Sequence, residues 1–201
     1  MLNEKINNKT YSTNNTENIP IGDCVAKAIR QALTHSRHDW QYCFLKRGGD
    51  SGEHYLTAEE ILNASEHLAC HLRAIIPVSN PVILSLEHGP NFLISLIACF
   101  FANRIVIPMP VPRFELHIAR AEHILKITGN AYILTKNNYF NLFNSGTLPS
   151  LIQNRFIDFE ILMNSPYDKN SASQTQNKRP TPNTPVVIQF TSGSTNLPKG
   201  V

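Results

Sequence analysis

The chain has 201 residues, of which 42% are hydrophobic, and its formal net charge is +3. This length allows one domain with its own core, and the composition is that of an ordinary globular protein. The charge is too small to indicate a nucleic-acid-binding or membrane-surface protein, so we expect no nucleic-acid partner.

The longest apolar run, residues 92–102, is too short to cross a membrane, which takes roughly 20 residues, so it predicts a buried helix. Residues 1–20 lack the apolar core of a secretory signal. We therefore expect no membrane span and a cytoplasmic protein. Its four cysteines are widely spaced without a CxxC pair, and we expect buried free thiols at Cys24, Cys43, Cys70 and Cys99.

Order is predicted to begin near Ile21. Residues 1–19 offer too little apolar surface to offset chain entropy, so a disordered N-terminus is predicted. Apolar residues at helical spacing predict a helix over residues 21–33. Two short runs, 42–45 and 53–56, flank the turn signal Gly48-Gly49-Asp50 and predict a small hairpin.

Strands and helices are predicted to alternate over the next hundred residues. Thr57 and Glu60 have the spacing of a capping box and predict a helix that runs to Pro77. The strands that follow are predicted at 82–86, 105–109, 131–135 and 156–159, and the helices at 91–102 and 116–128. This alternation predicts an α/β fold with a mostly parallel sheet flanked by helices. We expect an N-terminal subdomain over residues 20–164.

A polar segment, residues 165–184, interrupts this pattern and is predicted to be a linker or loop. We expect it and residues 1–19 to be the most mobile parts of the chain. An apolar run at 186–190 then predicts an inner strand of the sheet. Residues 185–201 therefore read as a strand followed by a loop.

The loop after this strand contains two hydroxyl pairs around a glycine and a later lysine: Thr191, Ser192, Gly193, Ser194, Thr195 and Lys199. Hydroxyl groups, backbone N–H groups and one cation can converge on a polyphosphate, and Gly193 allows a close backbone approach. A Walker-type loop is excluded because the Gly-Lys-Ser/Thr ending is absent. By composition alone, a flexible polar tail is the alternative.

The order of residues 190–201, Phe-Thr-Ser-Gly-Ser-Thr-Asn-Leu-Pro-Lys-Gly-Val, closely resembles the phosphate-binding signature of the acyl-adenylate-forming superfamily. This superfamily includes acyl-CoA synthetases, fatty acyl-AMP ligases, non-ribosomal peptide adenylation domains and luciferases. Asn196 stands where the family usually has glycine. Among the residues other than glycine, asparagine best tolerates a positive φ.

The resemblance extends upstream over roughly residues 21–201. Residues 55–60 are similar to an early strand-into-helix segment of the family. Ala102-Asn103-Arg104 stands where the family commonly reads Ala-Gly-Ala. The proline series Pro108, Pro110 and Pro112, with Arg113, is more similar to fatty acyl-AMP ligases than to CoA ligases.

The resemblance implies the N-terminal part of an ATP-dependent ligase that activates a fatty or other carboxylic acid. Thr191, Ser192, Ser194 and Thr195 would hold the β- and γ-phosphates of ATP, with Mg²⁺ expected in the complete enzyme, and Lys199 would add charge. The acyl group would pass to the thiol of an acyl-carrier protein or CoA. The family's other catalytic segments lie further on, so we assign no catalytic residue and expect this segment to be inactive alone.

Two alternatives remain open. The chain could be a truncated, non-catalytic fragment or a module that binds a partner, and the nucleotide sequence after codon 201 would decide. A different phosphate-binding protein would show the loop without the upstream match.

Weaker signals favour structural roles. His67 and His71 have helical i, i+4 spacing around Cys70, which can bind a metal, but no third ligand is evident, so no metal site is predicted. Arg113 could contact substrate, although contact with a neighbouring strand is favoured. Residues 87–90 follow a strand's carboxyl end, where active-site loops gather, and an ordinary turn is the favoured reading.

Overall fold

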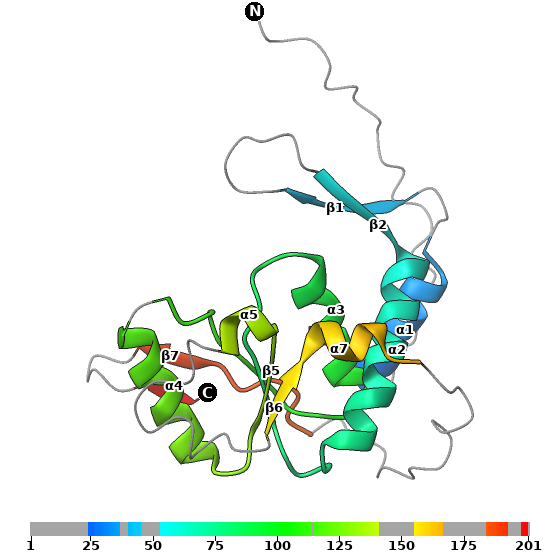
Figure 1. Cartoon of the computed structure of the whole chain (residues 1–201). Coiled ribbons are helices and arrows are strands. Elements are labelled where there is room, and N and C mark those ends of the chain that lie inside the picture. The colour runs from blue at the N-terminus through cyan, green and yellow to red at the C-terminus, as the bar shows by residue number, and fades with distance from the viewer. Residues whose placement is uncertain are drawn as a thin grey trace, which may run out of the picture.

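The computed structural model describes residues 24–36, 40–45, 53–113, 115–140, 155–166, 184–192 and 198–200. Helices and strands alternate along most of this length, as Figure 1 shows. The helices are α1 (Val25–Thr34), α2 (Ala58–Ile75), α3 (Pro90–Phe101), α4 (Glu115–Thr128), α5 (Asn137–Phe140) and α7 (Phe159–Asn164). The strands are β1 (Gln41–Leu45), β2 (Glu53–Thr57), β3 (Val82–Leu84), β4 (Val106–Pro108), β5 (Tyr132–Thr135), β6 (Phe156–Asp158), β7 (Phe190–Ser192) and β8 (Pro198–Gly200).

The centre of the fold is a parallel four-stranded sheet with strand order β4-β3-β5-β6. Val82 of β3 pairs with Val106 on one side and with Tyr132 on the other. All three residues of β3 are apolar and buried. This is expected for a parallel strand that has a partner strand on each side. The predicted α/β fold with a mostly parallel sheet is confirmed.

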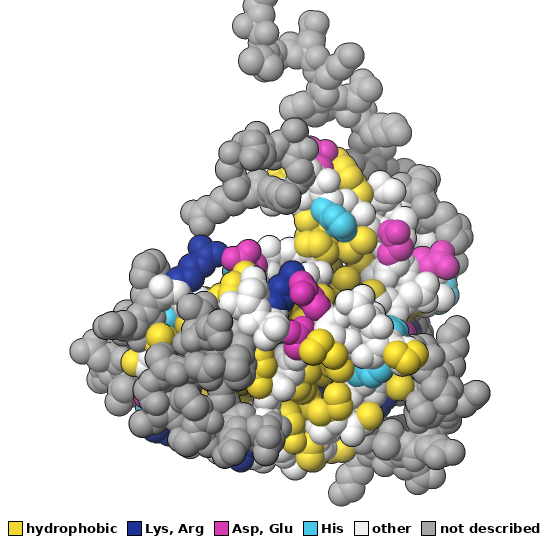
Figure 2. Space-filling model, in the orientation of Figure 1, with side chains coloured by type: hydrophobic (Ala, Val, Ile, Leu, Met, Phe, Trp, Pro, Cys, Tyr) yellow, Lys and Arg dark blue, Asp and Glu magenta, His cyan; other side chains and the backbone are white. Residues whose placement is uncertain are grey.

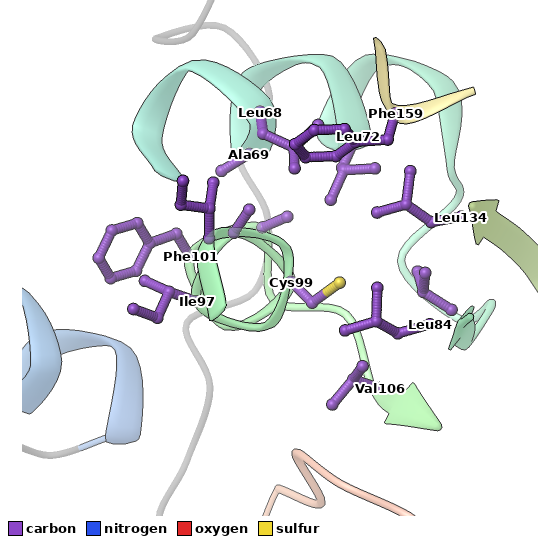
Figure 3. Packing of buried hydrophobic residues seen from close by; sticks show 14 of the residues in the cluster. Leu68, Ala69, Leu72, Leu84, Ile97, Cys99, Phe101, Val106, Leu134 and Phe159 are labelled. Atoms are coloured by element: carbon purple, nitrogen blue, oxygen red, sulfur yellow. The ribbon is translucent and has the colours of Figure 1, made fainter. Parts of the chain in front are cut away.

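One face of the sheet carries the larger apolar core. Successive strand residues point to opposite faces, and Val82 and Leu84 belong to this core with Leu134 of β5. Helices α2 and α3 pack over them, and α1 and α7 add the outer residues. Figure 3 shows side chains from the sheet, from α2 and from α7 converging on α3. This face is a closed layer of helices.

The other face carries a smaller core. Ile83, Ile107 and Ile133 point to this side and pack with residues of α4. Ile188 and Phe190, which lie just before and within β7, are partly buried against the same cluster. Figure 1 shows α4 and β7 together on the side of the sheet away from α1 and α2.

The N-terminal hairpin and its junction with α2 match the prediction. Strands β1 and β2 are antiparallel, with Leu45 opposite Glu53. The capping box is present, since the backbone N–H of Glu60 donates to Thr57 Oγ1 at 3.1 Å and that of Thr57 donates to Glu60 Oε2 at 2.8 Å. The predicted turn at residues 48–50 lies outside the described residues.

The tight turn between α3 and β4 is built on Asn103 and Arg104. Asn103 has a φ of 54°, the left-handed region that favours glycine, and its position is where the resembled family has glycine. Arg104 is 2% exposed, and its guanidinium donates to the carbonyl oxygens of Ile76 and Ala102 at distances of 2.5–3.0 Å. These bonds satisfy carbonyl groups at the ends of α2 and α3.

The main correction concerns the predicted inner strand at 186–190. Only Val187 makes a parallel bridge, with Val106 of β4, supported by hydrogen bonds from Val106 N to Val186 O and from Ile188 N to Val106 O, both 2.9 Å. The segment is therefore extended and parallel but lies at the edge, beside β4. At Phe190 the chain turns away from β4 to form the antiparallel hairpin of β7 and β8. No described strand pairs with the outer side of the segment 186–188.

Smaller differences concern short elements. The helices α5 and α7 were not predicted, and Phe159, expected in a strand, begins α7 because Asp158 caps that helix through bonds to the backbone N–H groups of Glu160 and Ile161. Residues 1–19 lie outside the described residues, as do all but three residues of 165–184, so their predicted mobility stays a prediction.

The cysteines are free thiols, but only two are buried. Cys70 and Cys99 are buried, and burial raises the pKa of the Cys99 thiol to about 12. Cys43 is exposed because it lies on a two-stranded hairpin, and Cys24 is half-buried. Within the described part of the chain, no helix is both long and apolar enough to cross a membrane.

Candidate functional site

Charged side chains gather beyond the carboxyl ends of the parallel strands, the edge at which ligands bind in such sheets. Arg113, which follows β4, pairs with Glu87, which follows β3. Lys136, which follows β5, pairs with Glu160 of α7 at 2.9 Å. Figure 2 shows basic and acidic side chains touching on this face of the molecule. Exposed pairs of this kind add little stability.

Arg113 therefore contacts the loop that follows the neighbouring strand β3, whereas the favoured prediction was contact with a strand itself. Glu87 also shapes the environment of Tyr139 on α5, whose pKa is raised by burial and by a hydrogen bond with Glu87. The loops after β3, β4 and β5 are thus joined through one carboxylate. The rest of the segment 87–90 is the turn into α3, with Gly89 at the N-cap and Pro90 at the first helical position.

The hairpin of β7 and β8 holds the ends of the predicted phosphate loop. Its register places Thr191 opposite Lys199 and Ser192 opposite Pro198. Two ends of a nine-residue motif are thereby brought to adjacent strands, as a loop that surrounds a ligand requires. Of the predicted site residues, the backbones of Thr191, Ser192 and Lys199 lie in this hairpin, whereas Gly193, Ser194 and Thr195 lie outside the described residues.

Gly200 packs closely against two apolar side chains. A Cβ atom at this position would lie 3.1 Å from Cγ2 of Ile188 and 3.3 Å from Cζ of Phe190. These distances are tighter than most Cβ contacts in proteins, so a side chain here would require Ile188 and Phe190 to shift by a few tenths of an ångström. The sequence motif includes this glycine, but its packing role was not predicted.

A small cavity of about 70 Å³ lies at the base of the hairpin. It is bounded by the proline series at the end of β4, by one face of α4 and by the start of β7, through Pro108, Met109, Pro110, His117, Arg120, Ile124 and Phe190. Neither His117 nor Arg120 belongs to the predicted site residues. Their i, i+3 spacing on an expected helix, close after the proline series, was the available signal.

The His67 and His71 pair lies on α2, away from this edge. The two rings are 4.9 Å apart between centroids, and His67 Nε2 lies 3.0 Å from the carbonyl oxygen of Leu162 in α7. Burial, and then the charge of His67, lower the pKa of His71. No group of three metal-ligating side chains occurs among the described residues, and the pair joins two helices.

Comparisons with known proteins point to one family. A family model described as "AMP-binding enzyme" matches residues 30–201. Among curated proteins, the chain is 25% identical over 163 residues to the medium-chain-fatty-acid–[acyl-carrier-protein] ligase JamA of Moorena producens, which covers 80% of this chain and 27% of that protein. It is 26% identical over 153 residues to the phosphinothricin tripeptide synthetase PhsC of Streptomyces viridochromogenes, covering 76% and 13%.

Solved structures agree on the fold. The chain superposes on a fatty acyl-adenylate ligase from L. pneumophila, in complex with acyl adenylate and pyrophosphate, with a TM-score of 0.70 and 24% identity. The match covers 89% of this chain and 30% of that one. The chain thus spans less than a third of the length of each of these three relatives.

Proposed function

Because the chain belongs to the AMP-binding enzyme family, we propose that it is the N-terminal part of an ATP-dependent ligase that activates a carboxylic acid as an acyl-AMP. The observation that carries this proposal is the hairpin that brings Thr191 opposite Lys199 at the edge of a parallel sheet. The activity proposed is that of a longer protein, since the chain covers only 27% of the ligase JamA.

The residues present fit the triphosphate of ATP. The hairpin pairs the two ends of a segment that is rich in hydroxyl groups, and Gly200 packs closely against Ile188 and Phe190 beside it. In this proposal Thr191, Ser192, Ser194 and Thr195 donate to the β- and γ-phosphates, Gly193 lets the backbone approach, and Lys199 supplies positive charge.

ATP supplies the α-phosphorus that the carboxylate attacks and pyrophosphate as the leaving group. The chain's own residues would bind and orient the terminal phosphates and stabilise the charge that develops on them. Such fixed donors commonly give the largest catalytic contribution. Mg²⁺ is expected to accompany the triphosphate in the complete enzyme, and we assign it no ligand in this segment.

A fatty acid is the proposed acid, and the thiol of an acyl-carrier protein is the proposed acceptor. The proline series after β4 and the similarity to JamA, named for a medium-chain fatty acid and an acyl-carrier protein, support this choice. An amino acid is the competing substrate because PhsC is a tripeptide synthetase, and CoA is the competing acceptor. Exchange of pyrophosphate into ATP with fatty acids or amino acids would separate the acids. A cytoplasmic location stays a prediction.

The direct test joins this segment to the downstream domains of a complete ligase. Replacing Ser194 and Thr195 together by alanine removes two donors, and loss of one such donor costs about 100- to 1000-fold in rate at oxyanion sites. We expect a loss of at least that size in acid-dependent pyrophosphate exchange, with transfer from preformed acyl-AMP preserved. Lys199→Ala should be milder because a flexible lysine acts as a point charge.

The matched control replaces Ser171 and Ser173, two hydroxyl residues outside the motif, by alanine. This variant should keep normal pyrophosphate exchange. Normal adenylation by the Ser194/Thr195 variant, or a defect confined to the transfer step, would contradict the phosphate-loop assignment. The 201-residue chain alone should show no acid-dependent exchange, because catalysis needs nucleotide and acid held in one geometry.

The competing function is a non-catalytic segment that binds a partner protein. It predicts that the loop variants of the joined ligase leave exchange unchanged. It also predicts that the reading frame after codon 201 carries none of the family's remaining motifs. Sequencing that region is the quickest way to separate the two.

A further inference from the structure

From the cavity at the base of the β7–β8 hairpin we infer a second phosphate subsite, in which Arg120 binds the terminal phosphate of ATP or the departing pyrophosphate. This inference rests on the proposed function, because it takes the hairpin to be a triphosphate loop. It adds a cationic residue from α4 that the loop motif does not contain.

The first observation is the charge of the cavity. Arg120 is half-buried and lines it, and no carboxylate is among the lining residues. Among the described residues Arg120 forms no ion pair and no hydrogen bond. A second arginine of this region, Arg113, is already paired with Glu87. Arg120 is therefore a cation at the hairpin without a protein counter-ion in the described part of the chain.

The second observation is the wall of the cavity. Met109 and Ile124 are buried, and Phe190 and two prolines complete an apolar lining. Apolar walls lower the local dielectric constant, so an anion beside a guanidinium is held more strongly there than on an open surface. Arginine presents a planar set of donors that matches a phosphate group.

His117 adds a polar group to the same wall. Its Nδ1 accepts a hydrogen bond from the backbone N–H of Arg113 at 3.2 Å. This bond fixes the ring of His117 beside the cavity. His117 and Arg120 are three positions apart in the sequence, which places them on one face of α4.

Size and position select the ligand. The cavity is small, at about 70 Å³, well below the roughly 300–1,000 Å³ of pockets that enclose a drug-sized ligand, so a small anionic group suits it better than a whole nucleotide. Phe190, which lines it, is the residue before Thr191 and lies in the same strand as the predicted loop. A phosphate group in the cavity would border the loop.

The test uses the 201-residue chain and measures pyrophosphate, ATP and AMP binding by calorimetry at low ionic strength. We expect Arg120→Gln to weaken pyrophosphate binding about tenfold or more, Arg120→Lys to restore part of it, and AMP binding to change less than twofold. Arg113→Gln is the matched control, since Arg113 is an exposed arginine outside the cavity lining. It should bind pyrophosphate as the wild type does, and circular dichroism checks that each variant is folded.

The two phosphate sources separate in the same experiment. A larger Arg120 effect on ATP than on pyrophosphate assigns the subsite to the bound triphosphate, and the reverse assigns it to the leaving group. The inference is overturned if wild-type protein binds neither ligand, if Arg120→Gln binds both normally, or if Arg113→Gln weakens binding equally. If the Ser194/Thr195 double variant keeps full binding while Arg120→Gln loses it, the loop assignment fails and the subsite stands. The opposite result retains the loop assignment and removes the subsite.

Discussion

The two faces of the central sheet are built differently. On one face, α2 and α3 cover the strands completely, and α1 and α7 add a further apolar layer. On the other, α4 covers the strands with a smaller cluster, and the segment from Ile188 to the start of β7 adds only partly buried residues. The cavity and the hairpin both lie on this second side. We call the first face the scaffold face and the second, which carries the cavity and the hairpin, the thin face.

The largest expected effect comes from truncating the scaffold. Leu72 of α2 is fully buried in the larger core, and Leu72→Ala should lower the free energy of unfolding by about 2–5 kcal/mol. Ile124→Ala on α4 is the matched change, and we expect the lower end of that range because the surrounding cluster is smaller and borders a cavity. Urea titrations of both variants measure the difference. A larger loss for Ile124→Ala would reverse the assignment of the two faces.

Arg104 tests how the scaffold face is joined to the edge strand β4. Arg104→Met keeps much of the side-chain volume but leaves buried carbonyl groups of Ile76 and Ala102 without their donors. Each unsatisfied group costs about 1–3 kcal/mol, and Arg104→Lys should recover part of the loss. Thermal unfolding of the two variants checks this. Equal stability of Arg104→Met and wild type would show that the carbonyl groups find other partners.

Two turns with left-handed residues allow a comparison of backbone strain on opposite faces. Asn103 follows α3 with a φ of 54°, and Gly129 follows α4 with a φ of 62°. A Cβ at Gly129 meets no atom within 4 Å, so the cost of alanine there is the backbone term, about 1–2 kcal/mol.

We expect Asn103→Ala to lose a similar amount and Asn103→Gly to be at least as stable as wild type. Chemical denaturation of the three variants gives the values. A stabilising Asn103→Ala would mean that the turn adopts a different conformation in solution.

The smallest expected effect is a pH dependence specific to the scaffold face. Burial and the charge of His67 lower the pKa of His71 from its ordinary value of 6.5, so the unfolded chain binds the proton more tightly. The free energy of unfolding is therefore highest, as far as His71 is concerned, above pH 6.5, and it declines as the pH falls below 6.5.

His71→Gln should remove this part of the decline between pH 7 and about pH 5, whereas His123→Gln on α4 serves as the control on the other face. Unfolding midpoints at several pH values measure it. If His71→Gln shows the same dependence of the unfolding midpoint on pH as the wild type, His71 is not the source of the decline in stability.

Much of the scaffold could be predicted from local sequence signals. The capping box at Thr57, the hairpin and the strand–helix alternation each depend on residues close together in the chain. The glycine-like position of Asn103 followed from the family pattern, and its φ agrees. These features need no knowledge of distant contacts.

The edge position of residues 186–188 and the cavity could not be predicted in this way. An apolar run indicates a strand but not which strand lies beside it, and the pairing of Val187 with Val106 is a distant contact. Arg120 and Phe190 likewise meet only after α4 and β7 have packed on the same face. The sequence motif therefore predicts the loop, which stays a prediction, but not the residues of α4 that line the cavity beside β7.

The bridge between Val106 and Val187 also has a consequence for the order of folding. The strand β4 is fixed by its neighbour β3, close in sequence, whereas Val187 can join it only after α4, β5, β6 and α7 have been traversed. Closing such a long stretch of chain is entropically costly, and distant pairings form slowly. The sheet can assemble first and receive the loop-bearing segment last. The pairing of Val187 with Val106 can also be lost without disturbing the registers of β3, β5 and β6, so the segment around Val187 can unfold locally while the rest of the sheet stays paired.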